Sequence, residues 1–285
     1  MTELFDIPYT IPATQKTLRT SSSIPYTIIQ TMNTNKLPKK MYLTAIEWSI
    51  KNPEYNYEFY DDKRIIEFIK NNYNKNILTK FMVINSGAAK ADFFRWLYLN
   101  KYGGVYIDID SECLKPINQI IKKYQHINNV FISKSNLCNN NNNLEWLKKI
   151  GFRINHNFIA CSPNHILLKN SIKNSITVFN NAFKGKKNIK LPQNLCGPGI
   201  LGFSLNLSLN KPKLKLNYPG MYNINQGGNF KVILLDPNNL RNYINPKYTG
   251  YNEDEKKISG PHYNLPGVFA FSYIKCKKYL EQNKI

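Results

Sequence analysis

The chain has 285 residues, of which 42% are hydrophobic and 20% charged, and a formal net charge of +21. This length is sufficient for one α/β domain with an elaboration or for two small domains, and no apolar run reaches the roughly 18 residues of a membrane span. Five scattered cysteines without a C-x-x-C pair exclude a disulfide framework and a zinc ribbon, and favour a reducing compartment.

The first half of the chain predicts an arm followed by alternating strands and helices. Residues 1–23 carry Pro, Thr and Ser without periodicity, which predicts an extended arm. The next elements expected are a strand over 26–30, a helix over 37–50, a strand over 55–60 and a helix over 64–72. An apolar helix over 88–102 should end at Gly103 and Gly104, because glycines adopt the positive φ found after helices, and a strand over 105–107 follows.

The second half continues the alternation. The elements expected are a helix over 116–124, strands over 130–133 and 157–161, a helix over 165–179 and a strand over 231–235. Residues 196–203 predict a glycine-punctuated turn, 238–260 a long loop or lid, and 259–272 a buried strand before a charged helix. Strands alternating with helices predict an α/β fold with a mostly parallel central sheet flanked by helices.

Two aspartates, Asp108 and Asp110, follow the predicted strand 105–107 directly. Ligands of open α/β sheets bind at this end of the strands, and two carboxylates suit a hard divalent cation that keeps positions open for phosphate oxygens. The alternative is a pair of aspartates that only caps the next turn.

Asp92 and Arg95 favour the metal site, because residues three apart share one face of a helix. The two-glycine turn can fold that face back towards Asp108 and Asp110. Arginine is suited to forked hydrogen bonds with sugar hydroxyls or phosphate oxygens. The alternative for this pair is an ordinary ion pair on the helix surface.

The run from Ala88 to Asp110, A-x-x-A-D-x-x-R-x-x-x-L-x-x-x-G-G-V-Y-x-D-x-D, resembles the signature of a sugar-transferase family with an Asp-x-Asp motif, glycosyltransferase family 32. Ile24-Pro25 with Ile28-Ile29-Gln30-Thr31 resembles the family's opening strand, although Ile29 and Met32 replace the usual His and Trp. Asn157 to Ala160, followed by Pro163 and His165, and the turn at Gly197-Pro198-Gly199 extend the resemblance to about Phe203.

The resemblance implies a GT-A type nucleotide-sugar-binding fold over residues 24–285. Within it, 24–133 would bind the nucleotide sugar, and 134–285 would form the acceptor side and a C-terminal lid. The implied activity is a metal-dependent, retaining glycosyltransferase that moves a hexose-type sugar from a UDP-sugar or GDP-sugar to a hydroxyl of a glycan or protein.

The resemblance also implies roles for single residues. Mn²⁺ or Mg²⁺ would be held by Asp110 and Asp108, with Asp108 also near the ribose, and His262 would be a further ligand or else an ordinary loop histidine. Asp92, Arg95 and Asn157 would contact the donor sugar or the acceptor, and Ile28, Gln30 and Gly197 would line the nucleotide site. The remaining histidines, His126, His156 and His165, show no ligand spacing and are interpreted as structural.

Two other functions stay open at this stage. The changes at Ile29 and Met32 allow a catalytically inactive relative that only binds sugars, and the net charge allows a basic protein that binds nucleic acid. The lysines are dispersed and accompany many Asn, Ile and Tyr residues, all with A/T-rich codons, so genome composition explains the charge and we do not expect nucleic acid as a partner.

The same codon bias is typical of a large DNA virus or an AT-rich microbe. Because the N-terminus lacks the pattern of a signal peptide, we expect a cytoplasmic protein, in the host cytoplasm or the virion if the source is viral.

Overall fold

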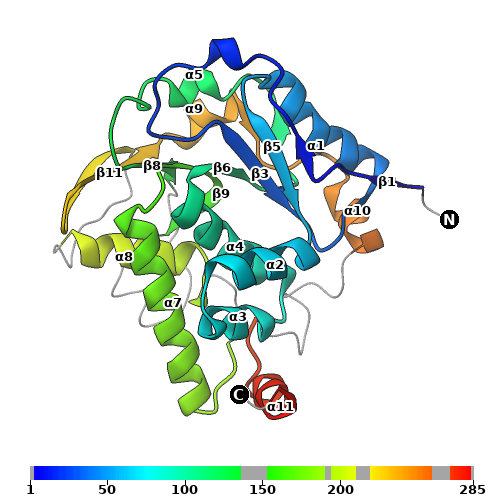
Figure 1. Ribbon diagram of the computed structural model, residues 1–285, viewed down its shortest axis with the longest axis vertical. Coiled ribbons are helices and arrows are strands. Elements are labelled where there is room, and N and C mark those ends of the chain that lie inside the picture. The colour runs from blue at the N-terminus through cyan, green and yellow to red at the C-terminus, as the bar shows by residue number, and fades with distance from the viewer. Residues whose placement is uncertain (1–2, 136–152, 190–193, 210–218, 259–269, 284–285) are drawn as a thin grey trace.

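The computed structural model describes residues 3–135, 153–189, 194–209, 219–258 and 270–283. Its centre is an eight-stranded sheet with helices on both faces (Figure 1). In spatial order the strands are β10 (Gly220–Asn225), β11 (Asn229–Leu235), β8 (Val130–Ser135), β9 (Ile154–Cys161), β6 (Gly104–Ile107), β3 (Thr27–Thr31), β5 (Asn56–Tyr60) and β2 (Thr10–Ile11).

Most strands of this sheet point in one direction. β3 is parallel to its neighbours β5 and β6, and β8 is parallel to β11. Because β9 lies between β6 and β8 and is antiparallel to both, β6 and β8 run in the same direction. The edge strands β2 and β10 are antiparallel to their neighbours. The α/β fold with a mostly parallel central sheet is therefore confirmed.

The two faces of the sheet bury separate hydrophobic cores, and alternation along the strands decides which core each side chain joins. Ile29 and Tyr106 belong to one core, whereas their neighbours Ile28 and Val105 belong to the other. The first core is covered by α2 (Asp62–Asn72), α3 (Lys75–Met82), α4 (Gly87–Tyr102), α7 (Ile166–Lys184) and α8 (Pro198–Ser208). The second is covered by α1 (Lys39–Lys51), α5 (Asn118–Ile121), α9 (Pro237–Arg241) and the segment up to α10 (Tyr251–Ile258).

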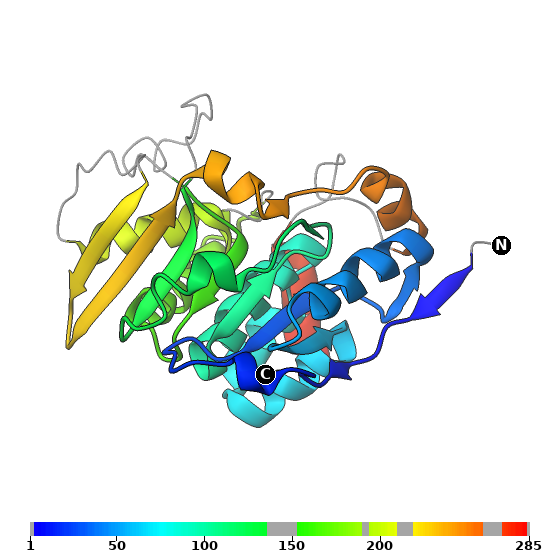
Figure 2. The ribbon, with the colours of Figure 1, turned by 90° about the horizontal axis from the view of Figure 1, so that it is seen from above.

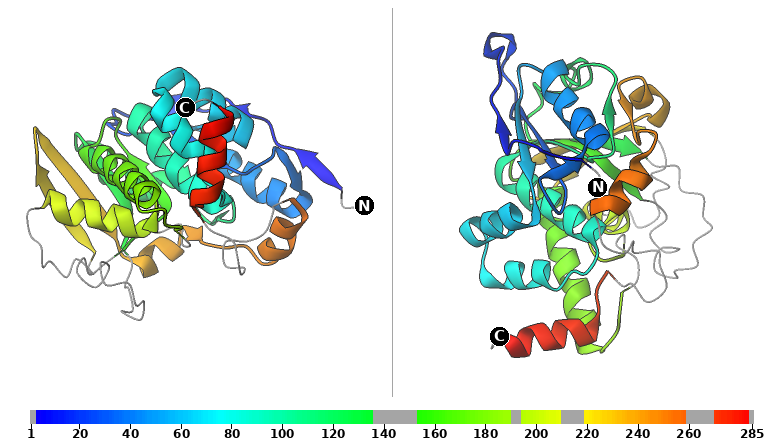
Figure 3. Two further views of the ribbon diagram at one scale, coloured as in Figure 1. Left: turned by 90° about the horizontal axis from the view of Figure 1, so that it is seen from below. Right: turned by 90° about the vertical axis from the view of Figure 1, so that its right-hand side faces the viewer.

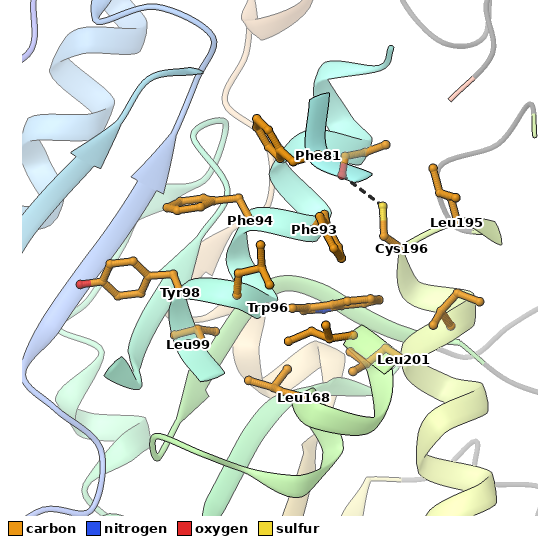
Figure 4. Packing of buried hydrophobic residues seen from close by; sticks show 14 of the residues in the cluster. Phe81, Phe93, Phe94, Trp96, Tyr98, Leu99, Leu168, Leu195, Cys196 and Leu201 are labelled. Carbon is orange, nitrogen blue, oxygen red and sulfur yellow. Dashed lines mark hydrogen bonds between the residues drawn. The ribbon is translucent and has the colours of Figure 1, made fainter. Parts of the chain in front are cut away.

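Helix α4 is buried nearly all round, as its apolar sequence predicts. Phe93 and Trp96 lie between the sheet and the helices α7 and α8, where they pack with Leu168 and Leu201 (Figure 4). This packing fixes the helix that carries two of the predicted site residues.

The turn after α4 requires both of its glycines. Gly103 and Gly104 have φ of 68° and 107°. A Cβ at Gly103 would lie 2.8 Å from the carbonyl oxygen of Cys161, and one at Gly104 would lie 2.9 Å from that of Thr27. The chain can therefore pass from α4 into β6 at close range only with glycine at both positions.

Two predictions for the C-terminal half are wrong. Residues 196–203 do not form a turn, because Pro198 begins the buried helix α8 behind Gly197. Its glycines, Gly199 and Gly202, are buried, so tertiary packing outweighs their weak helix propensity. Residues 238–258 are not one long loop, since they contain part of α9, the short strand β12 (Ile244–Asn245) and α10.

The N-terminal residues are also more ordered than an arm without periodicity suggests. β1 (Leu4–Asp6) pairs with β4 (Lys36–Pro38), and β2 pairs with β5 at the edge of the main sheet. Strands of two or three residues are too short to show alternation in the sequence.

In the last described segment, 270–283, Phe271 forms β-bridges with Ile84 and Ile189. The segment continues as α11 (Tyr273–Gln282), which contacts α7 (Figure 3). This confirms the charged C-terminal helix. Most of the strand predicted over 259–272 lies outside the described residues. No helix in the described part of the chain is long and apolar enough to cross a membrane.

Candidate functional site

The predicted site residues of α4 and β6 lie together at the C-terminal end of β6. Asp92 and Arg95 come from α4, and Asp108 follows β6 directly. The backbone N–H of Asp108 donates to the carbonyl oxygen of Asn157 on β9, 2.9 Å away. The site is thus built from one helix and two adjacent strands.

Arg95 joins the two carboxylates. Its Nη2 lies 2.9 Å from Oδ1 of Asp92 and 2.9 Å from Oδ1 of Asp108. The side chains of Arg95 and Asp92 are 4% and 9% exposed, whereas that of Asp108 is 30% exposed. The interpretation of Asp92 and Arg95 as a surface ion pair is therefore wrong, because both are buried and the guanidinium also reaches Asp108.

Further contacts fix the guanidinium of Arg95. Its Nη1 donates to the carbonyl oxygen of His156 at 2.5 Å, and its central carbon lies 4.2 Å from the centre of the Tyr106 ring. Burial opposes the charge, but Asp108, Tyr106 and Asp92 outweigh this effect and hold the pKa of Arg95 above its usual range. Arg95 is a permanent cation in a fixed orientation.

His156 is a member of this group that the sequence did not reveal. Its Nε2 lies 3.1 Å from Oδ1 of Asp92, and its side chain is 7% exposed. The available signal was weak: a polar residue at an inward position of β9, immediately before Asn157. The interpretation of His165 as structural agrees with its place, because it caps α7 and burial lowers its pKa to about 4.

Gln30 supports the backbone of the site. Its side-chain Nε2 donates to the carbonyl oxygen of Asp108 at 3.1 Å, and its Oε1 accepts from the hydroxyl of Tyr57 at 2.9 Å. Gln30 and Ile28 are both 0% exposed, and Ile28 lies in the core beneath α1. Both residues therefore shape the strand under the site with side chains that are fully covered.

Asp110 lies in the turn after β6 and contacts Tyr248, which belongs to the segment from α9 to α10. Figure 2 shows this segment in orange. The carbonyl oxygen of Asp110 accepts from the N–H of Tyr248 at 2.9 Å, and Ser111 Oγ lies 3.4 Å from its Oδ1. Within the described residues its carboxylate has no ion pair. Burial and the charge of Asp108 raise its pKa to about 7, and Lys247 opposes them.

The donor set fits a divalent cation that is only partly held by the protein. In the described part of the chain, no three His, Cys, Asp or Glu residues gather as a complete metal site. A half-buried carboxylate beside another, without a cation of its own, is stabilised by a divalent ion, and Mg²⁺-like ions commonly take one or two carboxylates with substrate phosphates. His262 lies outside the described residues.

Asn157 and Gly197 are the remaining predicted site residues that the structure describes. The Oδ1 of Asn157 is buried without a hydrogen-bond partner in the described structure, and the residue lines a small cavity with Lys134, Arg241 and Ile244. Gly197 is buried ahead of α8, and the neighbouring thiol of Cys196 donates to the carbonyl oxygen of Ala89 in the first turn of α4, 3.1 Å away (Figure 4).

Comparison with known proteins identifies the central region. Residues 38–127 match the family described as "Glycosyltransferase sugar-binding region containing DXD motif". "Inositol phosphoceramide mannosyltransferase 3" of Schizosaccharomyces pombe is 32% identical over 101 residues, which are 35% of this chain and 28% of that protein. "Initiation-specific alpha-1,6-mannosyltransferase" of Candida albicans is 32% identical over 113 residues, 38% of this chain and 29% of that protein.

A viral relative and a solved structure complete the comparison. An uncharacterized glycosyltransferase of Acanthamoeba polyphaga mimivirus is 38% identical over 64 residues, 22% of this chain and 26% of that protein. The chain thus spans between 26% and 29% of the length of these three relatives. The solved structure "PaToxG Glycosyltransferase" has a TM-score of 0.47 and 18% identity over 65% of this chain and 69% of that one. Residues 38–127, which contain Asp92, Arg95, Asp108 and Asp110, thus match a glycosyltransferase sugar-binding region with a DXD motif, and the chain is similar to fungal mannosyltransferases.

Proposed function

We propose that the chain is a metal-dependent glycosyltransferase of GT-A type that moves a hexose from a UDP-sugar or GDP-sugar to an acceptor hydroxyl with retention of configuration. The single observation that carries this proposal is the convergence of Asp92, Arg95 and Asp108 within the matched region. A buried arginine clamped between two carboxylates at a strand end is an arrangement for binding a polar ligand, since burying the Asp92–Arg95 ion pair for stability alone gains little.

On the donor side, Asp92 and Arg95 would bind the sugar hydroxyls, and Asp108 the ribose or the metal. Asp110 would be the direct ligand of Mn²⁺ or Mg²⁺, with Asp108 as its neighbour. When bound, such an ion neutralises the charge that develops on the leaving phosphate oxygen. Gln30, Ile28 and Gly197 would keep the walls of the nucleotide site in place.

The state of Asp92 argues against a covalent glycosyl–enzyme intermediate. Its Oδ1 is already engaged by Arg95 and by His156, so this carboxylate is a poor nucleophile for a covalent intermediate. We propose that the acceptor hydroxyl attacks on the face from which the nucleoside diphosphate leaves, and that the leaving phosphate takes its proton. Positioning and electrostatic stabilisation would then supply most of the rate enhancement.

The acceptor would approach over Asn157, as a glycan, protein or phosphorylated hydroxyl compound. The cavity beside Asn157 is lined by Lys134 and Arg241, which have no ion pair in the described structure. One relative is named for inositol phosphoceramide, whose phosphate such cations would attract.

The four described cysteines are free thiols, which supports a reducing, cytoplasmic location, and the mimivirus relative supports a viral source.

The test is a panel of UDP- and GDP-hexoses with Mn²⁺, scored by release of nucleoside diphosphate. We expect turnover with at least one donor and a loss of turnover of at least about 100-fold in Asp110→Asn. The matched control Asp6→Asn should keep the turnover of the wild type. Asp6 is a suitable control because it pairs with Lys36 on the surface and is 63% exposed. Binding of donors without turnover would instead favour the inactive sugar-binding relative.

A further inference from the structure

We propose that His156 is a positioning residue that orients the Asp92 carboxylate for the donor sugar. The proposal rests on the proposed function, and it adds a residue that lies outside the Asp-x-Asp signature and outside residues 38–127. His156 lies on β9, the strand that pairs with β6 in the sheet.

The contacts of Asp92 place two donors on one oxygen. Nη2 of Arg95 lies 2.9 Å and Nε2 of His156 lies 3.1 Å from the same Oδ1. A carboxylate held by one donor can still rotate about its last side-chain bond. Two donors that approach Oδ1 from different elements fix this rotation, and with it the direction of Oδ2.

Arg95 ties the histidine to the same unit. Its Nη1 donates to the carbonyl oxygen of His156, so the backbone of β9 and the side chain of α4 cannot move independently. The side chains of Asp92, Arg95 and His156 are all less than 10% exposed. A shift of His156 would therefore be transmitted to both groups that are proposed to hold the sugar.

The other ring nitrogen indicates that stability alone does not explain a histidine here. Nδ1 of His156 is buried without a hydrogen-bond partner in the described structure, and the ring lies beside Trp96 with their centres 6.1 Å apart. An unsatisfied buried polar atom costs about 1–3 kcal/mol, which a phenylalanine of similar shape avoids. The Nε2 contact to Asp92 is what a phenylalanine cannot supply.

The experiment compares His156→Phe and His156→Gln with the exposed control His126→Gln. Glutamine can place an N–H donor near the position of Nε2, whereas phenylalanine keeps the ring without a donor. For the donor that the wild type turns over, we expect kcat/KM of His156→Phe to fall about 10- to 100-fold, mainly through the donor KM. His156→Gln should recover to within about threefold of the wild type, and His126→Gln should not change.

Three outcomes overturn the proposal. His156→Phe with unchanged kcat/KM shows that the contact does not matter. Equal losses in His156→Phe and His156→Gln, with a lower Tm and an unchanged donor KM, show a structural role only. Absence of turnover by the wild type with every donor overturns the proposed function, and this inference with it.

A second measurement, NMR of the histidine ring protons, does not depend on turnover. In protein labelled with ¹⁵N at histidine, the Nε2–H of His156 should exchange slowly and give a downfield proton resonance. In Asp92→Asn that resonance should shift or disappear, while the signals of His126 and His165 stay in place. Rapid exchange of the Nε2–H of His156 in the wild type contradicts the proposal.

Discussion

The two aspartates of the Asp-x-Asp motif lie in different electrostatic surroundings, although one residue separates them. Asp108 is paired with Arg95 in a buried network that also contains Asp92 and His156. Asp110 has no ion pair among the described residues, and burial beside Asp108 raises its pKa to about 7. The protein itself supplies the cation for Asp92 and Asp108, whereas no described residue forms an ion pair with Asp110.

Under the proposed function, this difference would assign the sugar and the diphosphate of the donor to two kinds of binding site. The network around Arg95 presents fixed hydrogen-bonding groups, which suits the hydroxyls of a sugar. The turn at Asp110 presents an uncompensated carboxylate, which suits a metal that arrives with a diphosphate. Under the proposed function, the fold would preassemble the contacts to the sugar and would leave the contact to the diphosphate conditional on the metal.

Removal of Arg95 should have the largest effect on both stability and turnover. Arg95→Ala leaves Asp92 buried without its main partner, which costs about 3–5 kcal/mol for a buried ion pair. We expect a matching loss in the free energy of unfolding, measured with urea, and no detectable turnover. Arg95→Lys should recover part of the stability but little activity, since lysine lacks the planar fork. A Tm equal to that of the wild type would contradict a preassembled network.

Asp110→Asn should have the opposite effect on stability. The pKa of Asp110 is raised from 3.8 to about 7, so the wild type loses stability as pH rises from about 4 to about 7. Without metal, at pH 8, the variant should be more stable by on the order of 1–4 kcal/mol, and at pH 4 the two should be equal. Urea unfolding in EDTA at both pH values measures this. A variant that is less stable at pH 8 contradicts the uncompensated state of Asp110.

Gln30→Leu distinguishes between two roles of Gln30, support of the backbone at Asp108 and direct contact with the nucleotide. Loss of the amide leaves the hydroxyl of Tyr57 and the carbonyl oxygen of Asp108 without their partner, which should cost about 1–3 kcal/mol of folding stability. Because the side chain is fully covered, we expect the donor KM to change less than about threefold. A large rise in donor KM at unchanged stability would show that Gln30 contacts the nucleotide itself.

Lys247→Ala should have the smallest effect. The charge of this exposed lysine lowers the pKa of Asp110, so its removal should raise that pKa further. A titration followed by NMR of the Asp110 carboxyl carbon detects the shift, and Lys257→Ala, which removes the partner of Asp254, serves as the control. An unchanged Asp110 titration would mean that Lys247 lies too far away to compensate the carboxylate.

The sequence predicted the parts of the site whose signals are local. The helix over 88–102, the two glycines and the strand before Asp108 each carry their own pattern, and the spacing of Asp92 and Arg95 places both on one face. It missed His156 because the contact with Asp92 depends on how β9 packs beside β6. Nor could it show that Asp110 is less compensated than Asp108, since that depends on burial and on Lys247.

In the fold, too, local sequence signals were sufficient for some elements, whereas others depend on tertiary packing. The long periodic helix α4 was predicted within one residue at both ends, and α7 was predicted at its start but extends to Lys184, five residues beyond the predicted end. At helix α8 the sequence predicts a turn, because Gly199 and Gly202 weaken the local helix signal, and the helix forms through packing in the core.

The most direct test of the central claim is calorimetric binding of UDP- and GDP-hexoses, with Mn²⁺ and with EDTA, to the wild type, Asp110→Asn and Asp92→Asn. We expect the wild type to bind one donor at least tenfold more tightly with Mn²⁺, and Asp110→Asn to bind it equally weakly in both conditions. Asp92→Asn should keep the metal dependence for the free nucleoside diphosphate but lose the preference for the nucleotide sugar. Metal-independent binding by the wild type, or binding that neither substitution alters, would contradict the division of the site into a preassembled sugar half and a metal-dependent diphosphate half.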